Sequence, residues 1–280
     1  MLGPFAGAAA LLAEQEGVQG FTHVLSTVPP EEGGGDAALR LLEAAPKSGA
    51  FALEGVRWVG YCSSTSVYDG DGRGLRAPGA VVDEGSACAP RGEAARRRLR
   101  GEVAWGAALA SAGWEGRLRV FRLGALYGPG RSVLDAVRRE GGEGGEGGGG
   151  GTTGKSAQRR RLSPRVARIH VDDAVVAVLA SMAVAMDEEA ARAPQQPRVY
   201  NLVDDDDAPR LAALRHASRL LGLPPPECPP EAPPRDADKD KRVSNARMKA
   251  ELGVRLRFPS FREGLAAALS AEEEGRAPKL

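Results

Sequence analysis

The sequence has few cysteine, histidine and aromatic residues. Its 280 residues include three cysteines and three histidines, and Phe, Trp and Tyr together make up 5% of the chain. Three widely spaced cysteines do not make a disulfide framework, and they are typical of a reducing compartment. The histidines do not lie with cysteines, other histidines or acidic residues at the spacing of a ligand set. We therefore predict no metal site.

An excess of one charge and a long apolar run are absent as well. Lys and Arg number 38 against 37 Asp and Glu, which gives a formal net charge of +1. No field of one sign recruits nucleic acid or an anionic membrane. No apolar run approaches the roughly 18 residues of a membrane span, and the start at Met1–Pro4 does not read as a secretory signal. We expect a cytoplasmic protein whose partner is a small molecule, without nucleic acid or membrane. If a targeting segment precedes this sequence, an organelle is the alternative location. The sequence does not indicate an oligomeric state.

Segments typical of strands alternate with segments typical of helices. The expected strands are 22–28, 56–62, 118–123, 166–171 and 199–203, and the expected helices are 5–17, 37–45, 93–111, 172–186, 208–221, 244–252 and 260–271. This alternation predicts βαβ units and a mostly parallel sheet, in which ligands bind at the carboxyl ends of the strands. Two segments at such ends, Ser63–Ser66 and Gly124–Arg131, are candidates for the chemistry.

A tract of glycine and glutamate at Glu140–Gly154 interrupts this pattern. It contains a literal dinucleotide fingerprint, Gly142–Gly147, and a literal P-loop, Gly149–Ser156. Both motifs bind phosphate only between a strand and a helix, and the flanking residues are typical of neither. We interpret the tract as a flexible loop, and a P-loop nucleotidase is kept as a third hypothesis.

Five segments together resemble a known family. They are Ser63–Tyr68, Phe121–Arg131, Arg168–Asp173, Tyr200–Asp205 and Arg242–Leu265. In order and spacing they resemble the NAD-dependent epimerase/dehydratase family of extended short-chain dehydrogenases/reductases, and the last segment is typical of an atypical branch. The resemblance covers about residues 21–268.

The resemblance implies an α/β fold with a Rossmann-like parallel sheet, NAD or NADP as cofactor, and a small C-terminal substrate module. We expect an NAD(P)-binding domain at 1–205 with a flexible insert at 140–156, a substrate module at 206–270, and a tail at 271–280. The family transfers a hydride to and from a nucleotide sugar or a related alcohol. The expected function is therefore that of an NAD(P)-dependent oxidoreductase or epimerase acting on a small polar or sugar-linked substrate.

The resemblance also assigns candidate site residues. Ser64 stands where the family carries the hydroxyl that hydrogen-bonds the reacting oxygen, and Tyr68, just after it, is a candidate acid/base. The expected cofactor-binding residues are Ser26, Val28, Pro29, Leu123, Gly124 and Tyr127, and the expected substrate-binding residues are Arg131 and His170.

Two positions depart from the family's catalytic pattern. Its tyrosine aligns with Ala94, and its lysine, four residues later, aligns with Arg98. Arg98 keeps a positive charge, but position 94 offers no phenol whose pKa that charge could lower. Thr65 and Ser66 stand where sugar-nucleotide dehydratases carry an acidic pair, which disfavours a dehydratase. The alternative is a non-catalytic NAD(P)-binding or scaffold protein on the same fold.

The family's first strands and its glycine-rich turn have no counterpart in this sequence. We therefore expect the sheet to lack its first strands, which would leave the strand at 22–28 as an exposed edge. Two explanations stay open: the sequence is incomplete at its start, or the chain is a truncated and degenerate member of the family.

Overall fold

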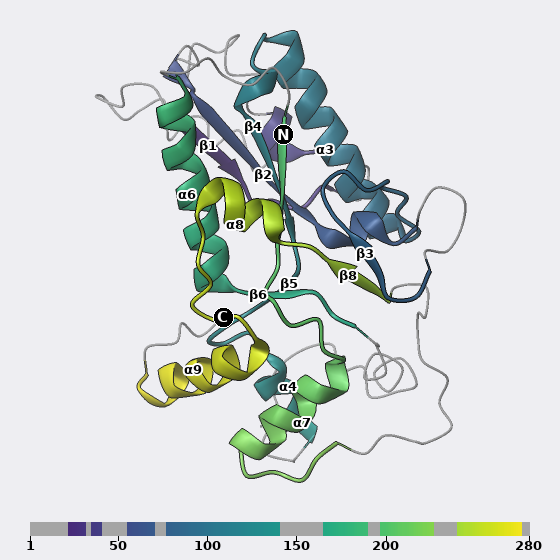
Figure 1. Cartoon of the computed structure of the whole chain (residues 1–280), viewed down its shortest axis with the longest axis vertical. Coiled ribbons are helices and arrows are strands. Elements are labelled where there is room, and N and C mark those ends of the chain that lie inside the picture. The colour runs from purple at the N-terminus through teal and green to yellow at the C-terminus, as the bar shows by residue number, and fades with distance from the viewer. Residues whose placement is uncertain are drawn as a thin grey trace, which may run out of the picture. The chain divides into compact units, whose positions relative to one another are not determined.

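The structure is a computed structural model of the chain, and Figure 1 shows how its helices and strands are arranged. It describes residues 22–31, 35–40, 55–70, 77–140, 165–189, 197–226 and 240–275. The chain divides into two compact units that interleave along the sequence. Unit 1 comprises Met1–Val67, Pro90–Arg122 and Val178–Tyr200, and unit 2 comprises Tyr68–Ala89, Leu123–Ala177 and Asn201–Leu280.

A Rossmann-like sheet forms the centre of unit 1. Its strand order is β1-β2-β4-β7, and the strands span His23–Ser26, Trp58–Ser64, Leu118–Leu123 and Arg198–Leu202. Strands β1 and β2 are parallel, with Ser26 in register with Tyr61. Helix α3 (Glu93–Ser111) packs on β2 through Trp105 and Leu109, which are fully or almost fully buried. The carboxyl ends of β1 and β2 therefore lie on one edge of this sheet.

Unit 2 contains two small parallel sheets and a group of short helices. Strand β5 (Ala125–Tyr127) pairs with β6 (Arg168–His170), and β3 (Ala80–Val82) pairs with β8 (Lys241–Val243). The helices are α4 (Val133–Glu140), α7 (Arg210–Leu220), α8 (Ala246–Leu252) and α9 (Phe261–Glu273). Side chains of β5, α4, α7 and α9 form one apolar core, with Leu134, Ala217 and Phe261 buried at its centre. This core holds β5 and β6 against the helices.

Most of the elements expected from the sequence are confirmed. Helix α3 and strand β4 have the expected bounds, and helix 37–45 begins as expected, with Asp36 accepting a hydrogen bond from the Leu39 amide (3.0 Å). The segment after β2 is a 3-10 helix, η2 (Thr65–Tyr68), and a second short one, η3 (Glu115–Arg117), precedes β4. Helix 5–17 and the glycine tract after Glu140 lie outside the described residues.

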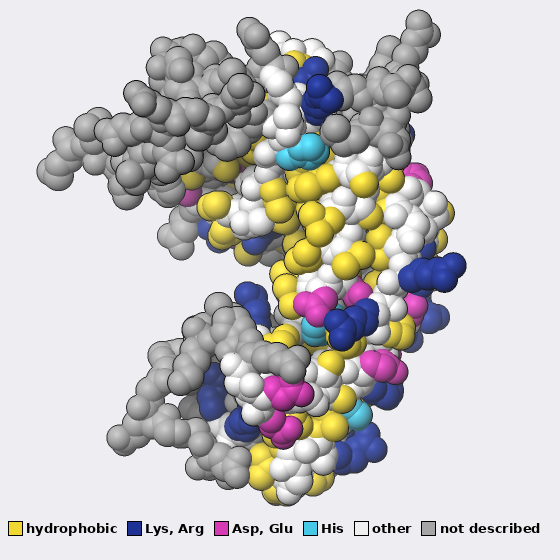
Figure 2. Space-filling view, turned by 90° about the vertical axis from the view of Figure 1, so that its left-hand side faces the viewer, with side chains coloured by type: hydrophobic (Ala, Val, Ile, Leu, Met, Phe, Trp, Pro, Cys, Tyr) yellow, Lys and Arg dark blue, Asp and Glu magenta, His cyan; other side chains and the backbone are white. Residues whose placement is uncertain are grey.

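Helix α6 (Val171–Glu189) carries apolar residues on two faces. Ala174, Ala177 and Ser181 are buried, whereas Val175 and Leu179 are 51% and 57% exposed. Figure 2 shows hydrophobic side chains gathered on one face of the molecule. An ordinary surface helix is apolar on the buried side alone, so α6 departs from that pattern. Within the described residues, no helix has both the length and the hydrophobicity needed to cross a bilayer.

Candidate functional site

Strand β1 ends at a buried hydroxyl. Ser26 is 2% exposed, and its Oγ has no hydrogen-bond partner among the described residues. Val28 and Pro29 follow it and are exposed. A buried hydroxyl without a partner destabilises the folded state by about 1–3 kcal/mol. Among the described residues, this end of the strand therefore carries a hydrogen-bonding group that is not used within the protein.

Strand β2 ends in two serines with different surroundings. Ser63 is buried, and its hydroxyl donates to Glu102 Oε1 (2.5 Å), a carboxylate that also binds Arg122 at 3.1 Å and 2.7 Å. Ser64 is partly exposed, and its Oγ accepts a hydrogen bond from the Ser66 amide (3.2 Å). That bond uses an acceptor site of Ser64 and leaves its hydroxyl proton available for a ligand. Among the described residues, the hydroxyl proton of Ser63 is engaged by Glu102, and that of Ser64 is donated to none of them.

Arg98, at the position of the family's lysine, is anchored to the same strand end. It lies on α3, and its Nη1 donates to the carbonyl oxygen of Cys62 (3.0 Å). Ala94 lies one turn earlier on that helix and is exposed. A guanidinium stays protonated in proteins and neither accepts nor releases a proton during a reaction. Arg98 therefore supplies positive charge at this edge and cannot act as an acid or a base.

The phenol of Tyr68 lies inside the core of unit 2. Tyr68 is fully buried, and its hydroxyl group hydrogen-bonds Asn201 Oδ1 (2.9 Å). Asn201 in turn donates from Nδ2 to the Ser244 carbonyl oxygen (3.1 Å). The phenol is thus part of a polar chain that ties the last residue of η2 to the C-terminal part of unit 2.

Leu123 is the last residue of strand β4, and Gly124 connects that strand to β5. Leu123 is partly buried, and the Gly124 amide donates to the Leu202 carbonyl (3.0 Å). A Cβ at position 124 would lie 2.9 Å from the Ala167 carbonyl oxygen. Position 124 therefore requires glycine because its backbone packs closely against the chain itself, in the segment that leads into β6.

Tyr127 and His170 face each other across the β5–β6 pair. Their rings meet edge to face with centroids 5.3 Å apart, and the Tyr127 hydroxyl donates to the Ser260 carbonyl (3.2 Å). His170 is 2% exposed; its Nδ1 accepts from the Asp172 amide (3.2 Å), and its Nε2 has no partner among the described residues. Burial raises the pKa of Tyr127 and lowers the pKa of His170. Both rings stay neutral near pH 7 and act first as packing groups.

Behind Tyr127 lies a pocket of about 180 Å³ that is rich in arginine. Arg131, Arg168 and Arg210 line it together with Ser132, and Val133 and Phe261 belong to its apolar wall. No acidic side chain is among the lining residues, all of which are described. The structure thus brings the predicted residues Tyr127 and Arg131 to one pocket, whereas His170 does not line it. Arg168, Arg210 and Ser132 are pocket residues that the sequence did not indicate.

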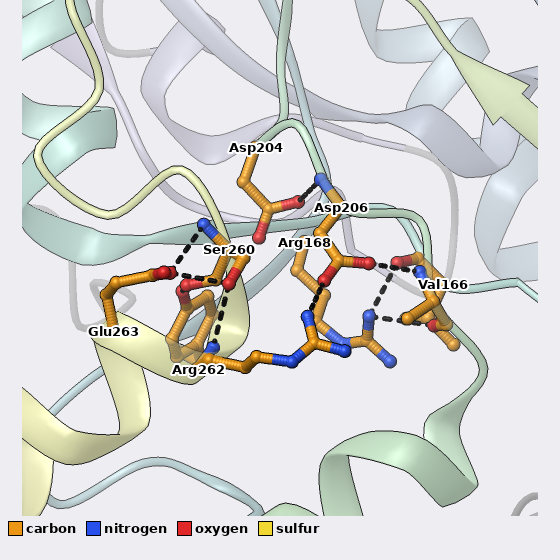
Figure 3. A network of polar contacts seen from close by, with 9 residues as sticks. Val166, Arg168, Asp204, Asp206, Ser260, Arg262 and Glu263 are labelled. Carbon is orange, nitrogen blue, oxygen red and sulfur yellow. Dashed lines mark hydrogen bonds and ion pairs between the residues drawn. The ribbon is translucent and has the colours of Figure 1, made fainter.

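Arg168 is a buried cation with part of its guanidinium unused. Its Nη1 donates to the carbonyl oxygens of Val166 (3.1 Å) and Ala208 (2.9 Å), as Figure 3 shows in part. Its Nη2 is buried and has no hydrogen-bond partner among the described residues. The guanidinium carbon lies 5.3 Å from the centroid of the Phe261 ring. Burial lowers the pKa of Arg168 from its usual value, but a guanidinium keeps its charge.

Of the two carboxyl groups near Arg168, that of Asp206 binds another arginine and that of Asp204 is mostly protonated. Asp206 binds Arg262 Nη1 (2.5 Å), as Figure 3 shows. Asp204 is 5% exposed, and its Oδ2 has no partner among the described residues. Burial raises the pKa of Asp204 to about 8, against the opposing field of Arg168. Near pH 7 the Asp204 carboxyl is mostly neutral, so it does not cancel the charge of Arg168.

Within the described residues, no cluster of three or more His, Cys, Asp or Glu side chains is arranged to hold a metal ion. No protein-family model and no curated protein matches the sequence.

Solved structures do match the chain. A functionally unknown conserved protein from Silicibacter pomeroyi shares 32% identity with it, with a TM-score of 0.63 over 92% of this chain and 80% of that one. A UDP-glucose 4-epimerase from Thermotoga maritima, solved with UDP-glucose, has a TM-score of 0.57 at 18% identity over 85% of this chain and 68% of that one. A dTDP-glucose 4,6-dehydratase from Bacillus anthracis, solved with NAD, has a TM-score of 0.58 at 15% identity over 90% and 73%.

These likenesses define first the fold and then the family. The fold is that of the NAD-binding epimerases and dehydratases, as the parallel sheet and the two enzyme structures agree. The chain belongs to the NAD-dependent epimerase/dehydratase family, which confirms the resemblance found in its sequence.

Proposed function

We propose that the chain is an NAD(P)-dependent oxidoreductase- or epimerase-like protein that acts on a small polar or sugar-linked substrate. The observation that carries the proposal is the pair of hydroxyls at adjacent strand ends of unit 1. Ser26 Oγ is buried without a partner among the described residues, and Ser64 keeps its proton available. In open α/β sheets such strand ends are where ligands bind.

The Ser26 hydroxyl, which has no partner among the described residues, is the group that would meet a polar cofactor at this strand end. Because the strand end already holds Ser26 desolvated, a hydroxyl or phosphate oxygen of a dinucleotide would pair with it at little further cost. Val28 and Pro29 would lie beside Ser26 along the cofactor. Leu123, Gly124 and Tyr127 would lie next to the nicotinamide. When bound, NAD or NADP supplies the hydride acceptor or donor.

Ser64 has the role of orienting the substrate in this proposal. Its hydroxyl proton would be donated to the oxygen of the reacting carbon while the Ser66 amide holds Oγ in place. Such a donor is commonly worth about 10²–10³-fold in turnover. Arg98 would add a fixed positive charge that favours negative charge developing on that oxygen. Arg131 and His170 are kept as proposed substrate-side residues, and Tyr68 as a proposed acid/base.

The test is hydride exchange by the purified chain. NAD or NADP is offered with UDP-glucose. Net oxidation is followed by the fluorescence of the reduced nicotinamide, and epimerisation, which restores the oxidised cofactor, is followed by chromatography of the sugar nucleotide. We expect Ser64→Ala to lower turnover about 10²-fold and Ser66→Ala, whose side chain lies one residue further into η2, to leave it unchanged. Equal turnover in wild type and Ser64→Ala would contradict the role of Ser64.

Burial of Tyr68 favours a second candidate, a non-catalytic NAD(P)-binding protein. The Tyr68 phenol is enclosed and bonded to Asn201, and Ala94 offers no other at the family's position. Without a proton carrier, a bound alcohol could not exchange its proton as hydride moves. This candidate predicts cofactor binding without turnover, and Tyr68→Phe would then alter stability alone. Loss of turnover in a folded, cofactor-binding Tyr68→Phe variant would exclude it.

A further inference from the structure

We propose that Ser63 is a positioning residue for Ser64: held by the buried carboxylate of Glu102, it fixes the end of strand β2 so that the Ser64 hydroxyl is directed at the substrate. The role of Ser64 rests here on the proposed function. The fixed strand end is measured without cofactor or substrate, so the two are tested separately. All the groups involved belong to unit 1.

The Ser63 hydroxyl is held by a charged acceptor inside unit 1. Ser63 is 2% exposed, and its hydroxyl donates to Glu102 Oε1 at 2.5 Å. The side chain of Glu102 is 8% exposed, so this bond is shielded from water. Hydrogen bonds with an ionised partner are shorter and roughly twice as strong as those between neutral groups. Ser63 is therefore held more firmly than a serine bonded to water, at the residue directly before Ser64.

Arg122 fixes the acceptor from a second strand. Its Nε and Nη2 donate to Glu102 Oε1 (3.1 Å) and Oε2 (2.7 Å), which is the bidentate geometry of a guanidinium on a carboxylate. Arg122 lies on β4, Glu102 on α3 and Ser63 on β2, so one carboxylate ties three elements together. A buried ion pair often stabilises a fold no more than apolar residues of the same size do. A need for stability alone does not account for this pair, whereas a need for a fixed position does.

Helix α3 holds the last residues of β2 through two side chains one turn apart. Arg98 donates from Nη1 to the Cys62 carbonyl oxygen (3.0 Å), and Glu102, four residues later, accepts from Ser63. Residues at this spacing lie on one face of a helix, where opposite charges pair with each other. Here both carboxylate oxygens of Glu102 are occupied, and Arg98 contacts the strand instead. The strand is therefore held by its backbone at Cys62 and by its side chain at Ser63, immediately before Ser64.

Ser64 makes one hydrogen bond that depends on this position. Its Oγ accepts from the amide of Ser66, which lies in η2, at 3.2 Å. This length is at the long end of the range for such bonds, so a small movement weakens it. Because Ser64 follows Ser63 directly, a rotation of the backbone at Ser63 would turn Ser64 relative to η2. Loss of the Ser63 hydroxyl should therefore be detected first at the Ser66 amide.

The experiment compares Ser63→Ala with Ser181→Ala, a matched loss of a buried hydroxyl in unit 1. Ser181 is 1% exposed and accepts from Trp58 Nε1 (3.1 Å). Amide hydrogen exchange is followed by NMR on the full chain without ligand, and circular dichroism shows whether each variant is folded. We expect exchange of the Ser66 amide to be about tenfold faster in Ser63→Ala and unchanged in Ser181→Ala. Exchange of Ser66 as slow in Ser63→Ala as in wild type, or equally faster in both variants, would overturn the proposal.

A second variant serves if Ser63→Ala does not fold. Ser63→Cys keeps nearly the same size and replaces the hydroxyl by a weak donor. We expect faster exchange of the Ser66 amide in this variant too, by a smaller factor than in Ser63→Ala. Wild-type exchange in a folded Ser63→Cys variant would contradict the need for a strong bond to Glu102.

Turnover in the hydride-exchange assay separates positioning from a purely structural role. We expect Ser63→Ala to lower kcat about tenfold, to leave KM unchanged, and to have no further effect in a Ser64→Ala background, because it acts through Ser64. An equal loss of kcat in both backgrounds, or no loss in either, would overturn the proposal. If the wild-type chain shows no turnover, the proposed function fails, whereas exchange of the Ser66 amide still decides whether Ser63 holds the strand end.

Discussion

The buried carboxyl of Asp204 gives the protein a specific dependence of stability on pH. Oδ1 accepts a hydrogen bond from the Asp206 amide (3.2 Å), and Oδ2 has no partner among the described residues. Burial raises the pKa of Asp204 to about 8 in the folded state, whereas an unfolded aspartate titrates near 3.9. Between these two values the folded protein keeps a proton that the unfolded chain loses, so stability falls as pH rises.

The size of the effect follows from proton linkage. One proton held by the folded state alone changes the free energy of unfolding by about 1.4 kcal/mol per pH unit. From pH 5 to pH 7 the Asp204 carboxyl alone should therefore lower the free energy of unfolding by about 3 kcal/mol, a large share of the 5–15 kcal/mol that stabilises a typical domain. Above about pH 8 both states are ionised, and this contribution stops changing. His170 acts in the opposite sense, since its lowered pKa reduces stability as pH falls below about 6.5.

The variant Asp204→Asn isolates the carboxyl. Asn keeps the Oδ1 acceptor and cannot ionise, so the stability loss between pH 5 and pH 7 should disappear even if the new amide changes the absolute stability. Urea unfolding followed by circular dichroism at several pH values measures this, with the exposed neighbour Asp205→Asn as control. If Asp204→Asn loses stability with pH as steeply as wild type, the Asp204 carboxyl is not the group responsible.

Two further substitutions test packing and a buried charge. Gly124→Ala should lower the free energy of unfolding by about 1–3 kcal/mol, because the new Cβ would lie 2.9 Å from a backbone oxygen. Gly106→Ala, in open space on α3, should raise the free energy of unfolding by about 0.5–1 kcal/mol. Urea unfolding measures both, and equal effects of the two substitutions would refute the clash at position 124. Glu102→Gln should cost about 3–5 kcal/mol because it removes the charge of one partner from the buried Arg122–Glu102 pair. Glu93→Gln, in an exposed pair, should leave the unfolding midpoint nearly unchanged. A small loss for Glu102→Gln in thermal unfolding would contradict this reasoning.

Long elements could be predicted from the sequence, and short ones could not. Helix α3 was predictable because its apolar residues recur on one face over 19 residues. Strands β3, β5 and β8 have three residues each, too few to show an alternation. They exist because a partner strand completes their hydrogen bonds, and that partner is distant in the sequence. Helix α4 was missed as well, since its eight residues directly precede the glycine tract.

The site was predictable in part for a similar reason. Ser26 and Ser64 were candidates because they match positions of the family at the ends of two predicted strands, and their roles stay predictions. Arg168 was not assigned, since in a strand of alternating residues the pattern Arg-Ile-His indicates Ile169 inside and its neighbours outside. The structure buries all three residues because β6 is covered on both faces. An arginine placed between Val166–Ala167 and Ile169 in the predicted strand 166–171 is the signal that could have indicated the pocket.

The proposed function requires that this chain bind a nicotinamide dinucleotide at the strand ends of unit 1. Isothermal calorimetry with NAD and NADP measures this binding, on chain shown by circular dichroism to be folded. We expect saturable binding of at least one of the two, weakened by Ser26→Val and unchanged by Ser86→Ala, a substitution outside the proposed site. Absence of binding by the folded chain, or binding that Ser26→Val leaves unchanged, would contradict it.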